Sequence, residues 1–184
     1  VLNGPPRFVS SNTSYEFNVQ KAIELLDKAG WKPGADGIRE KDGKKLKYVF
    51  QTSINQPRQS TQQIIKQACK KAGIEIELKA VTASVFFSSD TGSDDIFPKF
   101  YTDLQMYTAT PTQPDPGTFM RNFLSEEASS KANKWQGRNI TRWRNAEYDR
   151  IYAETTNNLD PVSRAAQFIQ LNDLVIKDVA VIPI

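Results

Sequence analysis

The sequence contains no histidine and only one cysteine among its 184 residues. Without histidine there is no imidazole general base, no Ser–His or Cys–His pair, and none of the common zinc sites. Cys69 has no partner for a disulfide within the chain, and its apolar helical surroundings are typical of a small buried residue. No glycine-rich phosphate loop, G-x-S-x-G motif or metal-ligand spacing occurs. We therefore predict no catalytic residues, no metal site and no cofactor.

Long apolar runs and a one-sided charge are also lacking. The strongest apolar runs, residues 85–87 and 179–184, are far shorter than the roughly 18 residues that span a membrane. The 24 basic and 21 acidic residues nearly cancel, to a net charge of +3. The basic residues are not gathered with stacking aromatic rings, as they are in nucleic-acid-binding surfaces. These observations argue against a membrane-spanning protein and against nucleic acid as a partner.

Hydrophobic periodicity and turn residues outline the elements. Gly30 and Gly73 are expected to end the first two helices, Ser14 is a candidate cap for the first, and Asp42-Gly43 is a strong hairpin signal. The sequence predicts helices over residues 19–29, 57–72, 83–88, 145–155 and 161–177, with a helical turn over 118–124. It predicts strands over residues 46–50, continuing to about 53, and over 74–78, 104–107 and 179–184.

The order of these elements predicts an α/β fold. Residues 48–78 read as strand, helix and strand with short connections, a βαβ unit whose strands pair in parallel. We expect a mixed sheet of about four to six strands flanked by helices. Residues 1–13 have linker composition and lead into a single domain, which spans residues 1–184 as a whole. Since natural chain ends are usually polar and frayed, the apolar segment 179–184 indicates that the chain is truncated at residue 184.

Three groups of residues carry a resemblance to a known family. The first is AIELLDKAGW (22–31) with DGIR (36–39) and DGK (42–44), and the second is Asp103-Leu104 with PDPGTF (114–119). The third is Gly137-Arg138-Asn139, Arg142-Trp143, Asn145, Tyr148-Asp149, Arg164 and the final VIPI. In this order, over almost the whole chain, they resemble the carboxy-terminal lobe of the family 5 solute-binding proteins, which include dipeptide, oligopeptide and nickel receptors.

The resemblance implies one ligand-binding lobe of a two-lobed, periplasmic-binding-protein-like fold of type II. Such a lobe captures a small ligand, here an oligopeptide or a related solute, for import by an ABC transporter. It implies a periplasmic or other extracytoplasmic location, with membrane association only through the transporter or a lipid anchor outside this segment. The implied partners are the small ligand and the ABC permease subunits, and the lobe itself is expected to be a monomer.

Two other functions are alternatives. One is a small α/β hydrolase that uses carboxylates, because Asp94, Asp95, Asp103 and Asp115 lie in or near loops. No set of residues, however, has the complementary roles of nucleophile, base and oxyanion donor. The other is a module that presents its ligand to a chemosensor. The sequence does not distinguish this module from a transport receptor, since both use the same lobe.

Ligands of α/β proteins lie beyond the carboxyl ends of the parallel strands, which makes the residues after each predicted strand the candidates. The candidate ligand-binding residues are Gln51, Thr52, Ser53, Thr82, Tyr107, Thr108, Ala109, Thr110, Thr112 and Asp115. By resemblance, the segment after the third strand borders the ligand, and Gln51 stands where relatives use a polar side chain.

Several candidates have alternative interpretations. Gln51, Thr52 and Ser53 are equally suited to capping the next helix, and Asp115 is suited to fixing its own turn through backbone amides. Peptide-binding relatives place an aspartate where this sequence has Thr112, to pair with the ammonium group of the peptide. A hydroxyl does not replace that charge.

Tryptophans and a basic cluster complete the set of candidates. Trp31 reads as a core corner, whereas Trp135 and Trp143 are open to stacking on a ligand. The cluster of Lys134, Arg138, Arg142 and Arg144 is either an anion site or a solvated surface.

Overall fold

The computed structural model describes all residues, 1–184, and the chain divides into two compact units. Unit 1 comprises Val1–Tyr15 and Ala109–Ile184, and unit 2 comprises Glu16–Thr108. The expectation that residues 1–184 form a single lobe stays a prediction. No helix is both long and apolar enough to cross a membrane.

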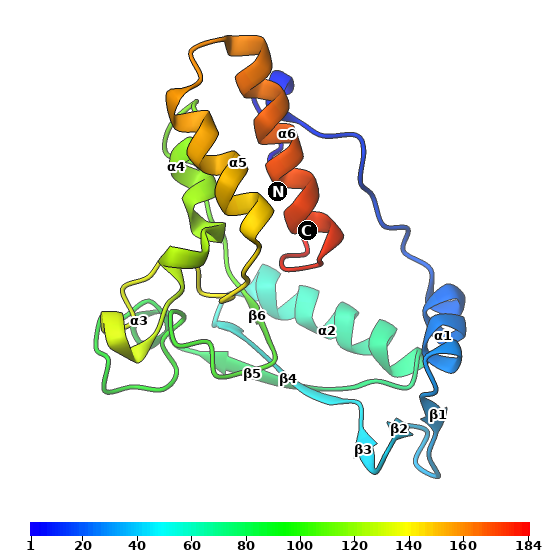
Figure 1. Cartoon of the computed structure of the whole chain (residues 1–184). Helices are drawn as coiled ribbons and strands as arrows, with labels where there is room; N and C mark the ends of the chain where they lie inside the picture. The colour runs from blue at the N-terminus through cyan, green and yellow to red at the C-terminus, as the bar shows by residue number, and fades with distance from the viewer. The chain divides into compact units, whose positions relative to one another are not determined.

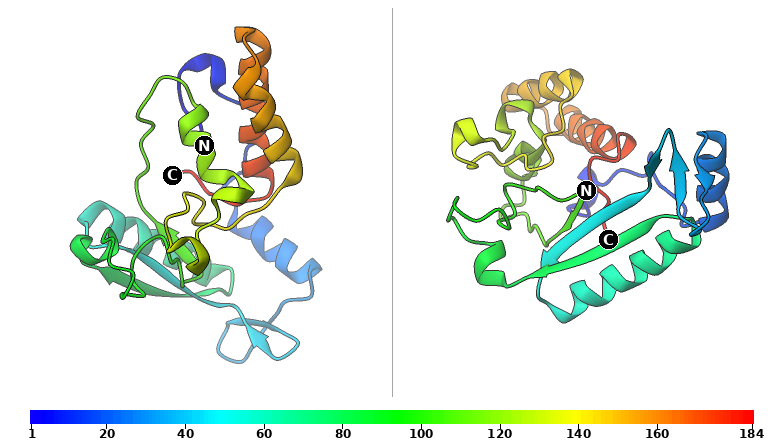
Figure 2. Two further views of the ribbon diagram at one scale, coloured as in Figure 1. Left: turned by 60° about the vertical axis from the view of Figure 1, so that its left-hand side comes forward. Right: turned by 90° about the horizontal axis from the view of Figure 1, so that it is seen from below.

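The centre of unit 2 is a three-stranded parallel sheet. Strand β4 (Lys47–Ser53) lies between β5 (Glu75–Val81) and β6 (Leu104–Met106), and both neighbours run parallel to it. Helix α2 (Gln56–Lys71) connects β4 to β5 and lies along the two strands (Figures 1 and 2). The predicted βαβ unit is confirmed, because Tyr48 pairs with Ile76 and Phe50 with Leu78 in a parallel register.

A second, antiparallel sheet belongs to the same unit. Its strands are β1 (Lys32–Pro33), β2 (Arg39–Lys41) and β3 (Lys44–Lys45). Asp42 and Gly43 both have positive φ, 51° and 74°, which is the geometry of the predicted two-residue hairpin turn. The α/β class is confirmed, but the expected single sheet of about four to six strands is wrong. The hairpin strands are too short and polar to offer an apolar face that would extend the parallel sheet.

Both long helices of unit 2 end and begin at identifiable residues. Helix α1 (Val19–Lys28) is capped by Asn18 rather than by Ser14, and α2 is capped by Asn55. Gly30 and Gly73 follow the helices with φ of 89° and 80°, as their sequence positions predicted. Helix α3 (Ala83–Phe86) follows β5 and is shorter than expected.

Arg39 is a buried cation at the junction of α1, the hairpin and the end of α2. Its side chain is 6% exposed and donates to the carbonyls of Ala72 and Trp31, at 2.9 and 2.6 Å, and to the Asp27 carboxylate at 2.8 Å. This pairing lowers the pKa of Asp27. The half-buried Trp31 therefore lies at a structural corner, as its sequence context suggested.

Unit 1 is helical. It contains α4 (Gly117–Met120), α5 (Ala146–Asn157) and α6 (Pro161–Lys177), together with short 3₁₀ turns at Pro6–Phe8, Arg121–Phe123, Ser125–Glu127 and Lys131–Asn133. The buried side chains of this unit include Met120, Tyr148 and Phe168. Asn145 and Asp160 cap α5 and α6 at the predicted positions.

The two ends of the chain differ from the sequence interpretation. Leu2 and Phe8, in the segment with linker composition, pack in the core of unit 1, and the Phe8 ring lies edge-on to Phe168 with centroids 5.6 Å apart. The predicted strand over residues 179–184 is wrong, because the segment is irregular. Val179 has a left-handed φ of 52°, and residues beyond it have no partner strand in the chain.

Candidate functional site

Three of the candidate residues end strand β4 and bond to neighbouring backbone or side chains. The Gln51 side chain donates to the Asp95 carbonyl at 2.9 Å, and the Thr52 hydroxyl donates to the Met106 carbonyl at 2.7 Å. Ser53 accepts a hydrogen bond from Arg58 at 2.5 Å. All three are nearly inaccessible to solvent. None of them caps α2, so that alternative is wrong, and their side chains instead connect the strand ends and loops of unit 2.

Arg58, in the first turn of α2, was not among the sequence candidates. Its guanidinium donates to the hydroxyls of Ser53 and Thr108, at 2.5 and 3.1 Å, and lies 6.0 Å from the centre of the Phe87 ring. It thus joins the end of β4 to the segment after β6. The signal that identifies it is a cation at the start of the helix that follows a parallel strand, a position whose side chain reaches the carboxyl edge of the sheet.

The residues after β5 and β6 lie beside a row of aromatic rings. Thr82 is exposed and precedes α3 without a capping bond from its side chain. Tyr107 is partly buried, which raises the pKa of its phenol. Its ring lies 5.4 Å from Phe97, which in turn lies 5.8 Å from Phe87. This aromatic row (Phe86, Phe87, Phe97 and Tyr107) gives the carboxyl edge of the sheet an apolar side.

The remaining candidates belong to unit 1. Ala109, Thr110 and Thr112 are exposed in an irregular segment. Asp115 accepts two hydrogen bonds from Arg164 of α6 and one from the Gly117 amide at 2.9 Å. The Arg164 pairing lowers the pKa of Asp115 and raises that of Arg164. These bonds agree with the interpretation of Asp115 as the residue that fixes its turn.

Trp135 and Trp143 occupy different environments. The Trp143 indole donates to Asp178 at 3.0 Å, and its ring lies edge-on to buried Tyr148 at 5.2 Å. Trp143 is therefore part of the packing of unit 1. The Trp135 ring lies 5.7 Å from the Arg142 guanidinium, whose Nε donates to the Ser129 carbonyl.

The residues of the basic cluster lie on either side of a buried asparagine, Asn139, in the sequence. Lys134, Arg138 and Arg144 are exposed, which agrees with a solvated surface. Asn139 is fully buried and donates to the carbonyls of Leu124 and Trp143. Its amide is thus engaged in the structure.

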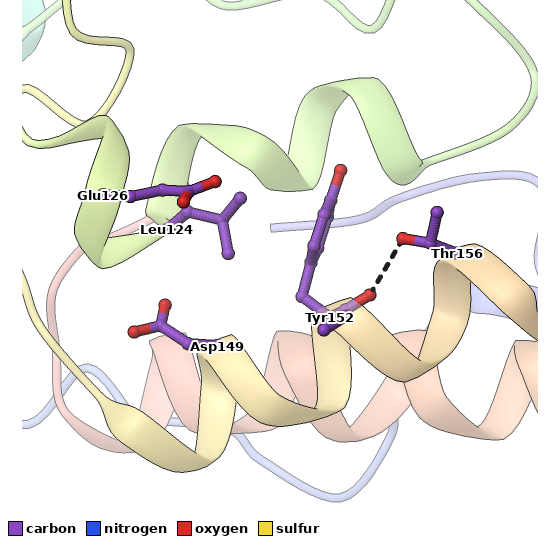
Figure 3. Close-up of a pocket in the computed structure, with 6 residues that line it drawn as sticks. Leu124, Glu126, Asp149, Tyr152 and Thr156 are labelled. Atoms are coloured by element: carbon purple, nitrogen blue, oxygen red, sulfur yellow. Dashed lines mark hydrogen bonds between the residues drawn. The ribbon is translucent and has the colours of Figure 1, made fainter.

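A cavity of about 340 Å³ lies in unit 1 (Figure 3), and none of the candidate residues lines it. It is lined by Leu124, Glu126, Asp149, Tyr152, Ala153 and Thr156. The Asp149 carboxylate accepts the Ser125 amide at 3.0 Å, and the Tyr152 hydroxyl donates to the Gly117 carbonyl at 2.9 Å. These polar groups hold the surrounding turns in place. The chain contains no group of three or more His, Cys, Asp or Glu side chains with the spacing of a metal site.

Hydroxyl, amide and aromatic side chains lie at the carboxyl ends of the strands of this parallel βαβ unit, which is where α/β proteins bind their ligands. Residues 1–131 match the family described as "Bacterial extracellular solute-binding proteins, family 5 Middle", so the chain belongs to that family. Family 5 is a family of solute-binding proteins, not of enzymes, and the hydrolase alternative is therefore set aside.

Solved structures and a curated relative agree with this assignment. The chain superposes on an oligopeptide-binding protein from Thermus thermophilus complexed with a pentapeptide, with a TM-score of 0.79, 25% identity and 95% of this chain covered. It shares its fold with NikZ from Campylobacter jejuni in complex with Ni(L-His), with a TM-score of 0.75, 21% identity and 91% coverage. It is 38% identical, over 69 residues or 36% of its length, to the oligopeptide-binding protein AppA of Bacillus subtilis.

The chain corresponds to only part of each relative. It covers 30% of the Thermus protein, 32% of NikZ and 13% of AppA. The predicted resemblance to family 5 is confirmed, and so is the α/β fold of part of an oligopeptide-binding protein.

Proposed function

We propose that this chain is a ligand-binding lobe of an extracytoplasmic receptor that captures an oligopeptide or related solute for import by an ABC transporter. The observation that carries the proposal is the set of polar and aromatic side chains at the carboxyl ends of β4, β5 and β6. In a solute-binding family, that edge is the expected place for a ligand. The proposed contacts at this edge, all in unit 2, are Gln51, Thr52, Ser53, Thr82, Tyr107 and Thr108. For Ala109, Thr110, Thr112 and Asp115, which belong to unit 1, the proposal rests on the family resemblance alone.

The partners follow from the same proposal. The complete protein would deliver its ligand to ABC permease subunits outside the cytoplasm, and the lobe would act as a monomer. The relatives support this choice of ligand, since two of them are described as oligopeptide-binding proteins. Delivery to a chemosensor is the competing use, and import assays with the permease present and absent separate the two.

Calorimetric titration tests the proposal. The complete protein that carries this chain and the 184-residue chain alone are titrated with the same oligopeptides, after mass spectrometry identifies what co-purifies with the complete protein. One lobe supplies only part of the contact area, while the ligand still loses translational and rotational freedom worth about 4–15 kcal/mol. We expect measurable affinity for the complete protein and much weaker affinity for the chain alone. If the complete protein binds no oligopeptide, the proposed ligand class is wrong.

A further inference from the structure

The basic residues of unit 2 gather at one corner of it. This corner comprises residues 27–47, with the end of α1 and the strands β1, β2 and β3, and residues 70–75 at the end of α2, and these elements lie together at one end of unit 2 (Figure 1). It contains nine Lys and Arg residues and five Asp and Glu residues, a net charge of +4, whereas the whole chain carries +3. The positive charge of the protein is therefore concentrated at this corner.

Hydrogen bonds of the hairpin hold the corner together. The Arg39 guanidinium, on β2, donates to the Asp27 carboxylate in α1 at 2.8 Å and to the Ala72 carbonyl at the end of α2 at 2.9 Å. The Lys41 ammonium, also on β2, donates to the Ala29 carbonyl at 2.8 Å. The two helix ends and the hairpin thus form one connected structure, and the lysines on them are held near one another.

Several of these lysines have no counter-ion. Three of the five acidic residues form ion pairs within the corner: Asp27 with Arg39, Asp36 with Lys45 and Glu75 with Lys47. Four exposed lysines form no ion pair, and we call them the lysine cluster: Lys28, Lys44, Lys70 and Lys71. Three of the four lie in the last turns of α1 and α2, but each helix end contributes only about half a negative charge. The cluster therefore remains positive.

The composition of the corner indicates the kind of partner that it fits. No exposed large hydrophobic side chain belongs to residues 27–47 or 70–75, and the one arginine, Arg39, is buried and paired. Protein interfaces are depleted in lysine and depend on aromatic and arginine anchors, and nucleic-acid sites add stacking rings. Lysine is a hydrated point charge on a flexible stem. Such a cluster suits a layer of many anionic headgroups.

We propose that the lysine cluster contacts the headgroups of a bilayer that contains anionic phospholipid, and that this contact orients unit 2 towards the membrane. The choice of a membrane rests on the proposed function, in which the receptor delivers its ligand to a membrane-embedded permease. The proposal adds a direct contact of the chain itself to the expectation that the membrane is reached only through the transporter or a lipid anchor.

Co-sedimentation with vesicles tests the proposal. The 184-residue chain is mixed with sucrose-loaded vesicles of phosphatidylglycerol and phosphatidylcholine in equal parts, or of phosphatidylcholine alone, at an ionic strength of about 0.1 M. The wild type should bind the anionic vesicles about a hundred-fold more tightly, because each lysine near an anionic surface raises the affinity about five-fold. At an ionic strength of about 1 M, where charges act over only about 3 Å, this binding should be lost.

Paired substitutions identify the residues responsible. K44Q/K71Q removes one charge from the hairpin and one from α2, and K28Q/K70Q removes one from each helix end. Glutamine has nearly the helix propensity of lysine, so the fold should be kept, as circular dichroism checks. Each pair should weaken binding to the anionic vesicles about ten-fold or more. If one pair fails to fold, the other decides.

The matched control is K131Q/K177Q. It removes the same charge from two exposed lysines of unit 1 that form no ion pair, one of them in the last turn of a helix, as in the cluster. Because charges beyond about 10 Å are screened at this ionic strength, the control should change the affinity less than about two-fold.

The outcomes separate this inference from the proposed function. Equal binding to both kinds of vesicle, binding that survives high salt, or equal losses in the control and the test variants overturns the membrane contact. Sedimentation of the wild type with neither vesicle overturns it too, and retention on immobilised polyglutamate then assigns the corner to an acidic protein. No peptide takes part in the vesicle assay, so its failure leaves peptide binding intact, and calorimetry without peptide binding overturns the proposed function alone.

Discussion

Replacing Arg39 by methionine tests whether the corner of unit 2 depends on one buried cation. Methionine keeps an apolar stem but removes every N–H donor. The substitution leaves the carbonyls of Ala72 and Trp31 without the partners that Arg39 provides at 2.9 and 2.6 Å. Each hydrogen bond from a charged donor contributes about 1.5–3 kcal/mol to stability. Because Trp31 is only half-buried, water can replace Arg39 as the partner of its carbonyl and offset part of the loss. We expect the free energy of unfolding of unit 2 to fall by about 3 kcal/mol.

The measurement is urea unfolding of the chain followed by circular dichroism, with hydrogen exchange of the peptides covering residues 36–46 and 69–76 to assign the loss to this corner. Lys32→Met is the matched control, because the Lys32 side chain is 69% exposed and approaches Asp27 only to 4.0 Å. The control should change stability little, as exposed ion pairs do. A loss below about 1 kcal/mol for Arg39→Met, or equal losses in both variants, would refute the reasoning.

Further substitutions probe other parts of the structure. Gly73→Ala should destabilise unit 2 by about 1–3 kcal/mol in urea unfolding, because φ is +80° and a new Cβ would lie 2.7 Å from Cγ of Arg39; unchanged stability would contradict this. Arg164 lowers the pKa of Asp115, so the pair stabilises the fold above the unfolded-state pKa near 4, and this contribution is lost as pH falls through the folded-state pKa. The urea midpoint of the wild type should therefore exceed that of Asp115→Asn by more at pH 7 than at pH 3. A difference that does not change with pH would refute the role of the pair. In the complete protein, Thr112→Asp should raise affinity for peptides with a free ammonium group, measured by calorimetry against N-acetylated peptides; no change across the panel would remove this segment from the site.

Elements with strong local signals were predictable from the sequence. The alternation of Ile74, Ile76 and Leu78 with charged residues identified β5, and proline after Asp160 identified the start of α6. Asp42-Gly43 identified the hairpin turn, because few other dipeptides adopt positive φ at both positions. In each case, neighbours in the sequence determine the conformation.

Features that depend on distant contacts were not predictable. Leu2 and Phe8 lie in a segment with the composition of a linker, yet they are buried because α6 provides an apolar surface for them. Residues 179–184 have the composition of a buried strand, but a strand requires a pairing partner, and none is present in the chain. The role of Arg39 could be identified only from the structure, in which two carbonyls and one carboxylate accept its hydrogen bonds.

The same distinction applies to the candidate site. Gln51, Thr52 and Ser53 lie at the carboxyl edge of the sheet, as their position at the end of a predicted strand indicated. The side chains of all three, however, already have partners within unit 2. A hydroxyl or amide that is engaged in this way is costly to redirect to a ligand, because its first partner would be left unpaired. A ligand that contacts Gln51, Thr52 or Ser53 must therefore offer a replacement for the bond that it displaces. Sequence position alone did not reveal Arg58 and Phe87 near these residues, since Arg58 belongs to the following helix and Phe87 caps the end of α3.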